Sequence, residues 1–192
     1  MQNLKNKKIL LASKSPRRKQ LLKDAGFNFE IITSKEVEEI IPNNIRNNEV
    51  AIYLSELKAN AYKNDLSENE ILISADTIVC LENKILGKPK DYDDAFKMLS
   101  NLSGKEHKVI TGVTICSNKK QVSFSDETSV KFKNLTNNEI NYYITNYKPF
   151  DKAGSYGIQE WIGYIGITEI KGSYFNVMGL PVHKVYEQLN KF

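Results

Sequence analysis

Cysteine and histidine are scarce in this chain, and each scarcity excludes a class of protein. Only two cysteines occur among 192 residues, which is too few for a disulfide-stabilised scaffold. Cys80 and Cys116 each end an apolar run and have no cysteine or histidine at metal-ligand spacing, so we expect two reduced core thiols. His107 and His183 stand far apart without a serine elbow. This argues against a Ser-His-Asp hydrolase, and we expect both histidines to be structural.

The sequence also lacks a segment that could enter a membrane. No run approaches the ~20 apolar residues of a spanning helix, and the apolar run near the N-terminus stops at Ala12. We therefore expect no signal peptide, no membrane partner and a cytoplasmic protein. The net charge is +4, but the lysines are scattered rather than gathered into a block. A stable complex with nucleic acid is therefore not expected either.

What the sequence does contain is an alternation of strand and helix patterns. Hydrophobic residues make up 41% and charged residues 26% of the chain, as in ordinary globular proteins. Strands are predicted at 9–11, 27–34, on both sides of a turn at 82–84, as two runs within 107–132, and once or twice after 159. Helices are predicted at 16–25, 47–63, 91–103, 136–147 and 180–192. With no linker or repeat, these elements predict one α/β domain over 1–192 with a mixed β-sheet.

The stretch ILLASKSPRRKQLL predicts a strand, a turn and a helix. Ser15 suits the N-cap and Pro16 suits the first helical position. Arg17 and Arg18 then lie at the positive end of the helix dipole, where a cation is unfavourable by ~0.3–1 kcal/mol. A bound phosphate would reverse that balance, because the free N–H groups, the hydroxyl of Ser13 and both guanidinium groups would hold it. The alternative is that both arginines are solvated.

Asp76 interrupts the apolar run ILISADTIVC, where an unpaired carboxylate would be expensive to bury. It needs a partner, which could be a magnesium ion, a lysine or an attacking water. A carboxylate at the end of a buried strand is a common position for a metal ligand or a general base. The acidic stretch EVEE, residues 36–39, could supply a second carboxylate at the same level. The alternatives are that Asp76 turns outward or caps a turn, and that EVEE is a solvated loop.

Two loops offer further candidate contacts. In GKP, Lys88 lies between two backbone-restricting residues, and a lysine with a fixed direction suits phosphate charge; an ordinary turn lysine is the alternative. In DKAGSYGIQ, Gly154 and Gly157 permit close approach of a ligand, and Gln159 offers a donor and an acceptor to a base edge. This loop lacks the glycine spacing of a Walker or Rossmann loop, so a structural tight turn is the alternative.

Six segments taken together resemble the Maf family of nucleoside triphosphate pyrophosphatases. They are LASKSPRRKQLL, SADTIV, GKP, MLSNLSGKEHKVITGV, DKAGSYGIQ and GSYFNVMGLP, in the family's order and approximate spacing over nearly the whole chain. The resemblance implies an elongated mixed β-sheet with flanking helices and two lobes around a central cleft, as in inosine triphosphatase-like enzymes. It also implies magnesium- or manganese-dependent hydrolysis of a nucleoside triphosphate to the monophosphate and pyrophosphate.

The resemblance further implies roles for individual residues. Asp76 is similar to the family's proton acceptor, and whether it is the general base or chiefly a metal ligand stays open. The residues that resemble its triphosphate- and metal-handling set are Ser13, Arg18, Glu38, Lys58 and Lys88, with Glu38 and Asp76 as the metal ligands. Those that resemble the specificity determinants of the dTTP/UTP-preferring subfamily are Arg17, Thr77 and Gln159. The 7-methyl-GTP-preferring group usually has an aromatic residue at the first arginine and no threonine after the aspartate. In one departure, the family typically has glycine after the glutamine, whereas Glu160 and Trp161 follow here.

The resemblance implies a housecleaning hydrolase that removes dTTP, UTP and modified pyrimidine nucleotides. A nucleotide-binding regulator of cell division is the alternative, since the family is also associated with inhibition of septum formation. A basic nucleic-acid-binding module is a third hypothesis, and the sequence lacks the dense basic stripe that such a module needs. From the family alone, we expect a homodimer.

Overall fold

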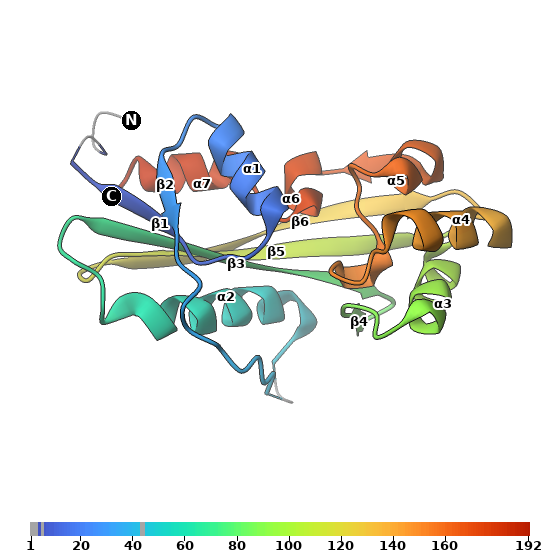
Figure 1. Ribbon diagram of the computed structural model, residues 1–192, viewed down its shortest axis with the longest axis horizontal. Coiled ribbons are helices and arrows are strands. Elements are labelled where there is room, and N and C mark those ends of the chain that lie inside the picture. The colour runs from blue at the N-terminus through green and yellow to red at the C-terminus, as the bar shows by residue number, and fades with distance from the viewer. Residues whose placement is uncertain (1–3, 5, 43–44) are drawn as a thin grey trace. The chain divides into compact units, whose positions relative to one another are not determined.

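A seven-stranded mixed sheet with flanking helices organises the part of the chain that the computed structural model describes, which is residue 4, residues 6–42 and residues 45–192. The strand order is β2-β1-β3-β5-β6-β7, and β4 pairs with β3 (Figure 1). The strands are β1 (Lys8–Leu11), β2 (Phe29–Ile31), β3 (Glu70–Leu81), β4 (Lys84–Leu86), β5 (Glu106–Cys116), β6 (Gln121–Phe132) and β7 (Ile167–Lys171). The helices are α1 (Pro16–Asp24), α2 (Asn47–Lys63), α3 (Tyr92–Leu102), α4 (Asn137–Tyr147), the 3₁₀ turn η2 (Ala153–Ser155), α5 (Trp161–Gly166), α6 (Tyr174–Met178) and α7 (Val182–Leu189). The predicted mixed α/β class is confirmed.

The described residues form two compact units, each assembled from separate segments of the chain. The first unit takes its residues from Met1–Asp76, Thr111–Asp126 and Gly179–Phe192. The second takes them from Thr77–Ile110 and Glu127–Met178. Strands β3, β5 and β6 contribute residues to both units. That 1–192 acts as one domain stays a prediction.

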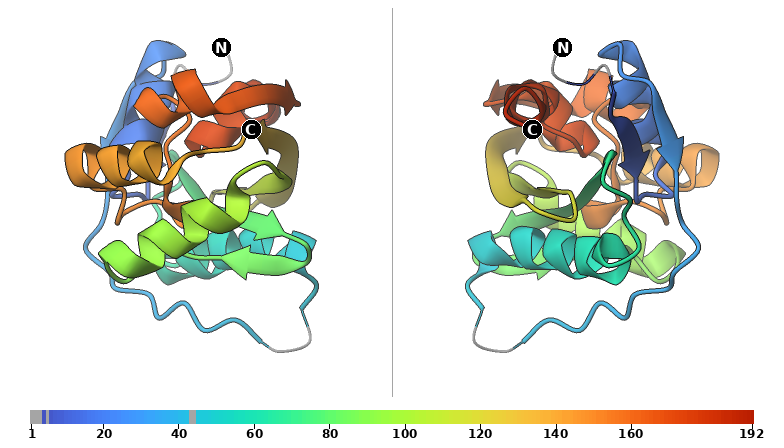
Figure 2. Two further views of the ribbon diagram at one scale, coloured as in Figure 1. Left: turned by 90° about the vertical axis from the view of Figure 1, so that its right-hand side faces the viewer. Right: turned by 90° about the vertical axis from the view of Figure 1, so that its left-hand side faces the viewer.

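The first unit places helices on both faces of three strands. Strand β1 pairs in parallel with β2 and β3, and Leu11 lies opposite both Ile31 and Ile73. Helices α1 and α7 lie on one side of β1 and β3, and α2 lies on the other, as both figures show (Figures 1 and 2). Burial on both faces explains why β1 and β3 appear in the sequence as apolar runs, whereas β2 is largely exposed. Because β1 and β3 are parallel, the residues that follow Leu11 lie level with those that follow Ile73 in β3.

The second unit packs α3 and α4 over its own apolar core. The buried side chains include Leu99 from α3, Ile140 and Tyr143 from α4, and Phe132 from β6. Both helices begin where the sequence predicts. Asp91 caps α3 by accepting from the Asp94 N–H, and Thr136 forms the predicted capping box with Glu139 at the start of α4.

The segment after Gln159 differs from its prediction. One strand, β7, is present, but the short helices α5 and α6 flank it where only strands were expected. The sequence WIGYIG is a short apolar run, which periodicity cannot assign to strand or helix. The structure makes this run a helix, and a Cβ placed at Gly163 would lie 1.8 Å from the carbonyl oxygen of Ile158. The chain can therefore turn back on itself here only with glycine at this position.

Both cysteines are free and buried, as predicted. Burial raises the pKa of the Cys80 and Cys116 thiols. Neither thiol is therefore activated as a thiolate.

None of the helices in the described part of the chain has the length and apolar character that a bilayer crossing requires.

Candidate active site

Asp76, Lys58 and Glu39 form a charged group in the first unit. The ammonium of Lys58, from α2, contacts Asp76 Oδ1 and lies 3.0 Å from Glu39 Oε1. The Asp76 and Lys58 side chains are only 15% and 18% exposed. Because little solvent screens them, the electrostatic attraction between the two charges is stronger than it would be in water. The partner that Asp76 needs is therefore a lysine, one of the three possibilities that the sequence left open.

Helix α2 is held against the sheet directly behind this group. A Cβ on Gly112 of β5 would lie 2.2 Å from the backbone of Ala51, so the helix approaches the strand as closely as glycine allows. The buried hydroxyl of Ser74 donates to the Ser55 carbonyl at 2.7 Å, and the Ser55 hydroxyl bonds that of Thr114 at 2.8 Å. Since Ser55 lies one turn before Lys58 and Ser74 lies two residues before Asp76, these bonds fix one catalytic candidate relative to the other.

The start of α1 adds a cationic side to the same unit. Ser15 caps the helix and Pro16 occupies its first turn, as predicted. Arg18 donates from Nε to the carbonyl oxygen of Gly179 at 2.8 Å and from Nη1 to the hydroxyl of Ser13 at 3.4 Å. Burial lowers the pKa of Arg18 from its ordinary value, while Asp76 and Glu39 oppose that shift. An arginine remains charged under such a shift.

Strand register explains why α1 and Asp76 belong to one site. Leu11, the last residue of β1, is level with Ile73 of β3, so Ser13 lies just beyond the end of β1, while Asp76 lies three residues after Ile73 within β3, which continues to Leu81. Ligands of open α/β sheets bind outside the carboxyl ends of parallel strands, and the end of β1 is such a position. The predicted residues Ser13, Arg18, Lys58 and Asp76 are thus brought together, and Arg17 lies half-buried at the start of α1 beside them.

The predicted metal pair is only partly assembled. Glu39, rather than Glu38, reaches Lys58, while Glu38 is exposed and stays a prediction as a ligand. The sequence could not choose between adjacent glutamates, because that choice depends on the path of an irregular segment. Glu39 and Asp76 both direct carboxylate oxygens at the ammonium of Lys58. Carboxylate oxygens are also the ligands that magnesium and manganese prefer. Among residues 4, 6–42 and 45–192, no three His, Cys, Asp or Glu side chains form a metal-holding group, so substrate oxygens would have to complete the shell.

The remaining predicted site residues lie in the second unit. Thr77 follows Asp76 along β3, and Lys88 is exposed after β4. The loop 151–160, which carries Gln159, is tied to the GKP turn because the Gly154 N–H donates to the Gly87 carbonyl at 3.0 Å. Two of the three candidate positions in this unit therefore belong to loops that are bonded to one another.

Buried polar side chains hold loop 151–160. The phenol of Tyr156 bonds His107 Nε2 at 2.7 Å, and burial lowers the pKa of His107 to about 4, so this imidazole is neutral at pH 7. Tyr143 accepts from the Gly157 N–H at 3.0 Å and donates to Glu160 Oε2, while Lys152 lies 3.1 Å from Glu160 Oε1. Neither Tyr143 nor Lys152 was predicted as a site residue. The sequence signal that pointed to this loop was the glutamate at position 160 in place of the family's glycine.

Gln159 itself carries an unusual acceptor. Its Oε1 is buried and has no hydrogen-bond partner among the residues that the structure describes. Buried polar atoms are nearly always satisfied, so an open acceptor requires an explanation. A ligand with an N–H group would provide its partner.

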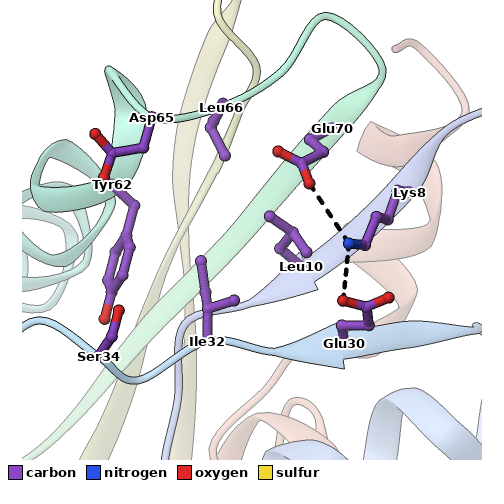
Figure 3. A pocket seen from close by; sticks show the side chains of 9 residues that line it. All are labelled: Lys8, Leu10, Glu30, Ile32, Ser34, Tyr62, Asp65, Leu66 and Glu70. Atoms are coloured by element: carbon purple, nitrogen blue, oxygen red, sulfur yellow. Dashed lines mark ion pairs between the residues drawn. The ribbon is translucent and has the colours of Figure 1, made fainter.

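A separate pocket of about 250 Å³ lies at the other end of β1 and β3. Figure 3 shows the ammonium of Lys8 between two carboxylates, 2.8 Å from Glu30 and 3.6 Å from Glu70. Asp65 adds a third carboxylate to the lining. This pocket is acidic and lies at the amino ends of the strands, so it is unsuited to a phosphate and is distinct from the group around Asp76.

Proteins with one shared name match this chain over nearly its whole length. The proteins named dTTP/UTP pyrophosphatase from Flavobacterium psychrophilum, Phocaeicola vulgatus and Parabacteroides distasonis are 55%, 52% and 49% identical to it. The alignments cover 94%, 100% and 100% of this chain and 92%, 99% and 100% of those proteins. The structure of the Staphylococcus aureus Ham1 protein aligns with 66% of this chain and 72% of its own at a TM-score of 0.47 and 16% identity, which is too distant to add to the assignment. The family model for Maf-like proteins matches residues 8–192, and the chain therefore belongs to the Maf-like protein family.

Proposed function

We propose that this protein hydrolyses dTTP and UTP to the nucleoside monophosphate and pyrophosphate. The observation that carries the proposal is the Asp76–Lys58 pair beside Arg18 at the start of α1. Such a group can bind a polyphosphate and accept a proton from water. The names of the full-length relatives support the choice of substrate.

Charge neutralisation is the first requirement of the reaction. Water attacks a phosphoanhydride through a transition state with negative charge spread over phosphate oxygens. Arg18 is already oriented by its bonds to Ser13 and Gly179, so it needs little reorganisation to bind those oxygens. The positive end of the α1 dipole and the charge of Arg17 act in the same direction.

Proton transfer is the second requirement. Asp76 accepts the proton of the attacking water, and Lys58 holds the carboxylate in place through its contact with Oδ1. A divalent cation held by Asp76 with Glu39 or Glu38 would polarise the phosphate and lower the pKa of a bound water. Lys88 of the second unit is assigned to phosphate charge.

Base recognition is assigned to Gln159, with Arg17 and Thr77 as further specificity residues. Uracil and thymine present an N–H between two carbonyl groups, which matches an amide with one acceptor and two donor hydrogens. The open acceptor Oε1 of Gln159 supports this assignment.

The test is pyrophosphate release from a panel of canonical and modified nucleoside triphosphates with magnesium or manganese. Asp76→Asn should lower kcat for dTTP and UTP by about 10³-fold, because the amide cannot accept the proton. Asp126→Asn is a matched control in the same unit, since Asp126 is 13% exposed and lies 2.6 Å from Lys184. It should leave kcat unchanged. No turnover of any nucleotide by folded wild-type protein would refute the proposal.

A further inference from the structure

Glu160 lies beside the proposed base-recognising residue and differs from the family's usual glycine. A Cβ placed at Gly157 would lie 2.9 Å from Gln159 Nε2 and 2.9 Å from Glu160 Cδ. Both side chains therefore cover the same glycine, and the amide nitrogen lies within about 6 Å of the carboxylate carbon. At that separation a buried charge acts strongly on an amide dipole.

The carboxylate of Glu160 is held by two buried partners. Lys152, whose side chain is 9% exposed, lies 3.1 Å from Oε1. The hydroxyl of Tyr143 contacts Oε2, and burial together with that hydrogen bond raises the pKa of Tyr143, so the phenol keeps its proton and donates it. Both oxygens of Glu160 are thus engaged, and the charge has a fixed position relative to Gly157 and Gln159.

A fixed negative charge orients the neighbouring amide. The donor end of the Gln159 amide is attracted to the carboxylate, and the acceptor end turns away from it. This leaves Oε1 as the open acceptor, as the structure shows. An acceptor in this position matches the N3–H of uracil or thymine and opposes cytosine, whose N3 is itself an acceptor. An amide free to turn over would accept either base.

We propose that Glu160, anchored by Lys152 and Tyr143, is a positioning residue that orients the Gln159 amide and thereby makes loop 151–160 select imide-containing pyrimidines over cytosine. This inference rests on the proposed function, in which Gln159 recognises the base. It concerns the ratio between substrates rather than the rate of hydrolysis. A residue that merely stabilised the loop would change the rates for both nucleotides together.

The experiment compares kcat/KM for UTP and CTP in wild type, Glu160→Gln and Tyr143→Phe. Glu160→Gln keeps the shape and removes the charge, so the UTP/CTP ratio should fall by about tenfold or more, while kcat for UTP changes by less than about threefold. Tyr143→Phe removes one anchor and should lower the ratio less. Glu139→Gln is the matched control, because Glu139 is 25% exposed, pairs with Lys133 at 2.6 Å and lies outside the loop. It should leave the ratio unchanged.

The outcomes separate this inference from the proposed function. Turnover of UTP with an unchanged UTP/CTP ratio in both variants would overturn the inference alone. An equal fall of the ratio in Glu139→Gln would overturn it too, because the effect would then be general to the unit. No turnover of either nucleotide by wild type would overturn the proposed function, and the inference with it. If Glu160→Gln does not fold, Tyr143→Phe and Lys152→Met decide by the same ratio.

Discussion

In the first unit Lys58 lies between the carboxylates of Asp76 and Glu39, and in the second unit Lys152 lies between those of Asp151 and Glu160. Asp76 contacts its lysine through Oδ1, whereas Glu160 engages both oxygens, one with Lys152 and one with Tyr143. The same lysine-carboxylate arrangement thus occurs in both units. In the proposed function, the pair near Arg18 holds a carboxylate that accepts a proton, and the pair in loop 151–160 fixes a charge beside Gln159.

The largest expected effect is on kcat and follows from removing Lys58, the lysine of the first unit. Lys58→Met removes the cation that Asp76 and Glu39 share, so two carboxylates are left facing one another. We expect kcat for UTP and CTP to fall together by about 10²-fold, with the UTP/CTP ratio unchanged. Steady-state kinetics with both nucleotides measure it, and Lys19→Met on the exposed face of α1 is the control. A changed ratio would contradict the division of roles between the units.

A backbone change should disturb the same group indirectly. Gly112→Ala places a methyl 2.2 Å from the backbone of Ala51, so α2 must move and carry Lys58 with it. We expect a loss of about 1–3 kcal/mol in the free energy of unfolding and a lower kcat for both nucleotides. Urea denaturation measures the first effect. Gly87→Ala, where nothing lies within 4 Å of the added carbon, should change the free energy of unfolding little.

Acid should weaken the second unit through His107. Burial lowers its pKa to about 4 from 6.5, so between these pH values His107 is protonated in the unfolded chain and neutral in the folded chain. The free energy of unfolding is therefore highest above pH 6.5 and decreases as the pH falls towards 4. Between pH 7 and 4.5 we expect wild type to lose about 2–3 kcal/mol more than His107→Gln, which cannot titrate. Urea denaturation at both pH values tests this, and equal losses in the two proteins would contradict it.

The smallest expected effect concerns stability alone. Thr136→Ala removes the capping box at the start of α4 and should lower the free energy of unfolding by about 1 kcal/mol. Neither kcat nor the UTP/CTP ratio should change, because the cap lies outside both lysine-carboxylate groups. Thermal unfolding and the two-nucleotide assay measure these quantities. A shifted ratio would contradict the assignment of this cap to stability alone.

Local sequence patterns predicted most of the elements and their ends. Ser15, Asp91 and Thr136 each cap the helix that was expected to follow them, because a capping side chain bonds backbone within its own turn. The segment after Gln159 was mispredicted. Its short apolar run contains no periodic signal, and the close approach of Gly163 to the backbone of Ile158 appears only in the structure.

The sequence by itself determined the strand-turn-helix over residues 9–22, the family, and the need of Asp76 for a partner, because these depend on residue types and spacings along the chain. Only the tertiary structure decided that the partner is Lys58, that Glu39 joins it, and that Lys152 and Tyr143 hold Glu160. The contacts of Lys58 join residues from different segments and depend on strand register and on how closely α2 approaches the sheet, and the contacts of Glu160 depend on the path of loop 151–160 and on its packing against α4. None of these features is encoded in a local pattern.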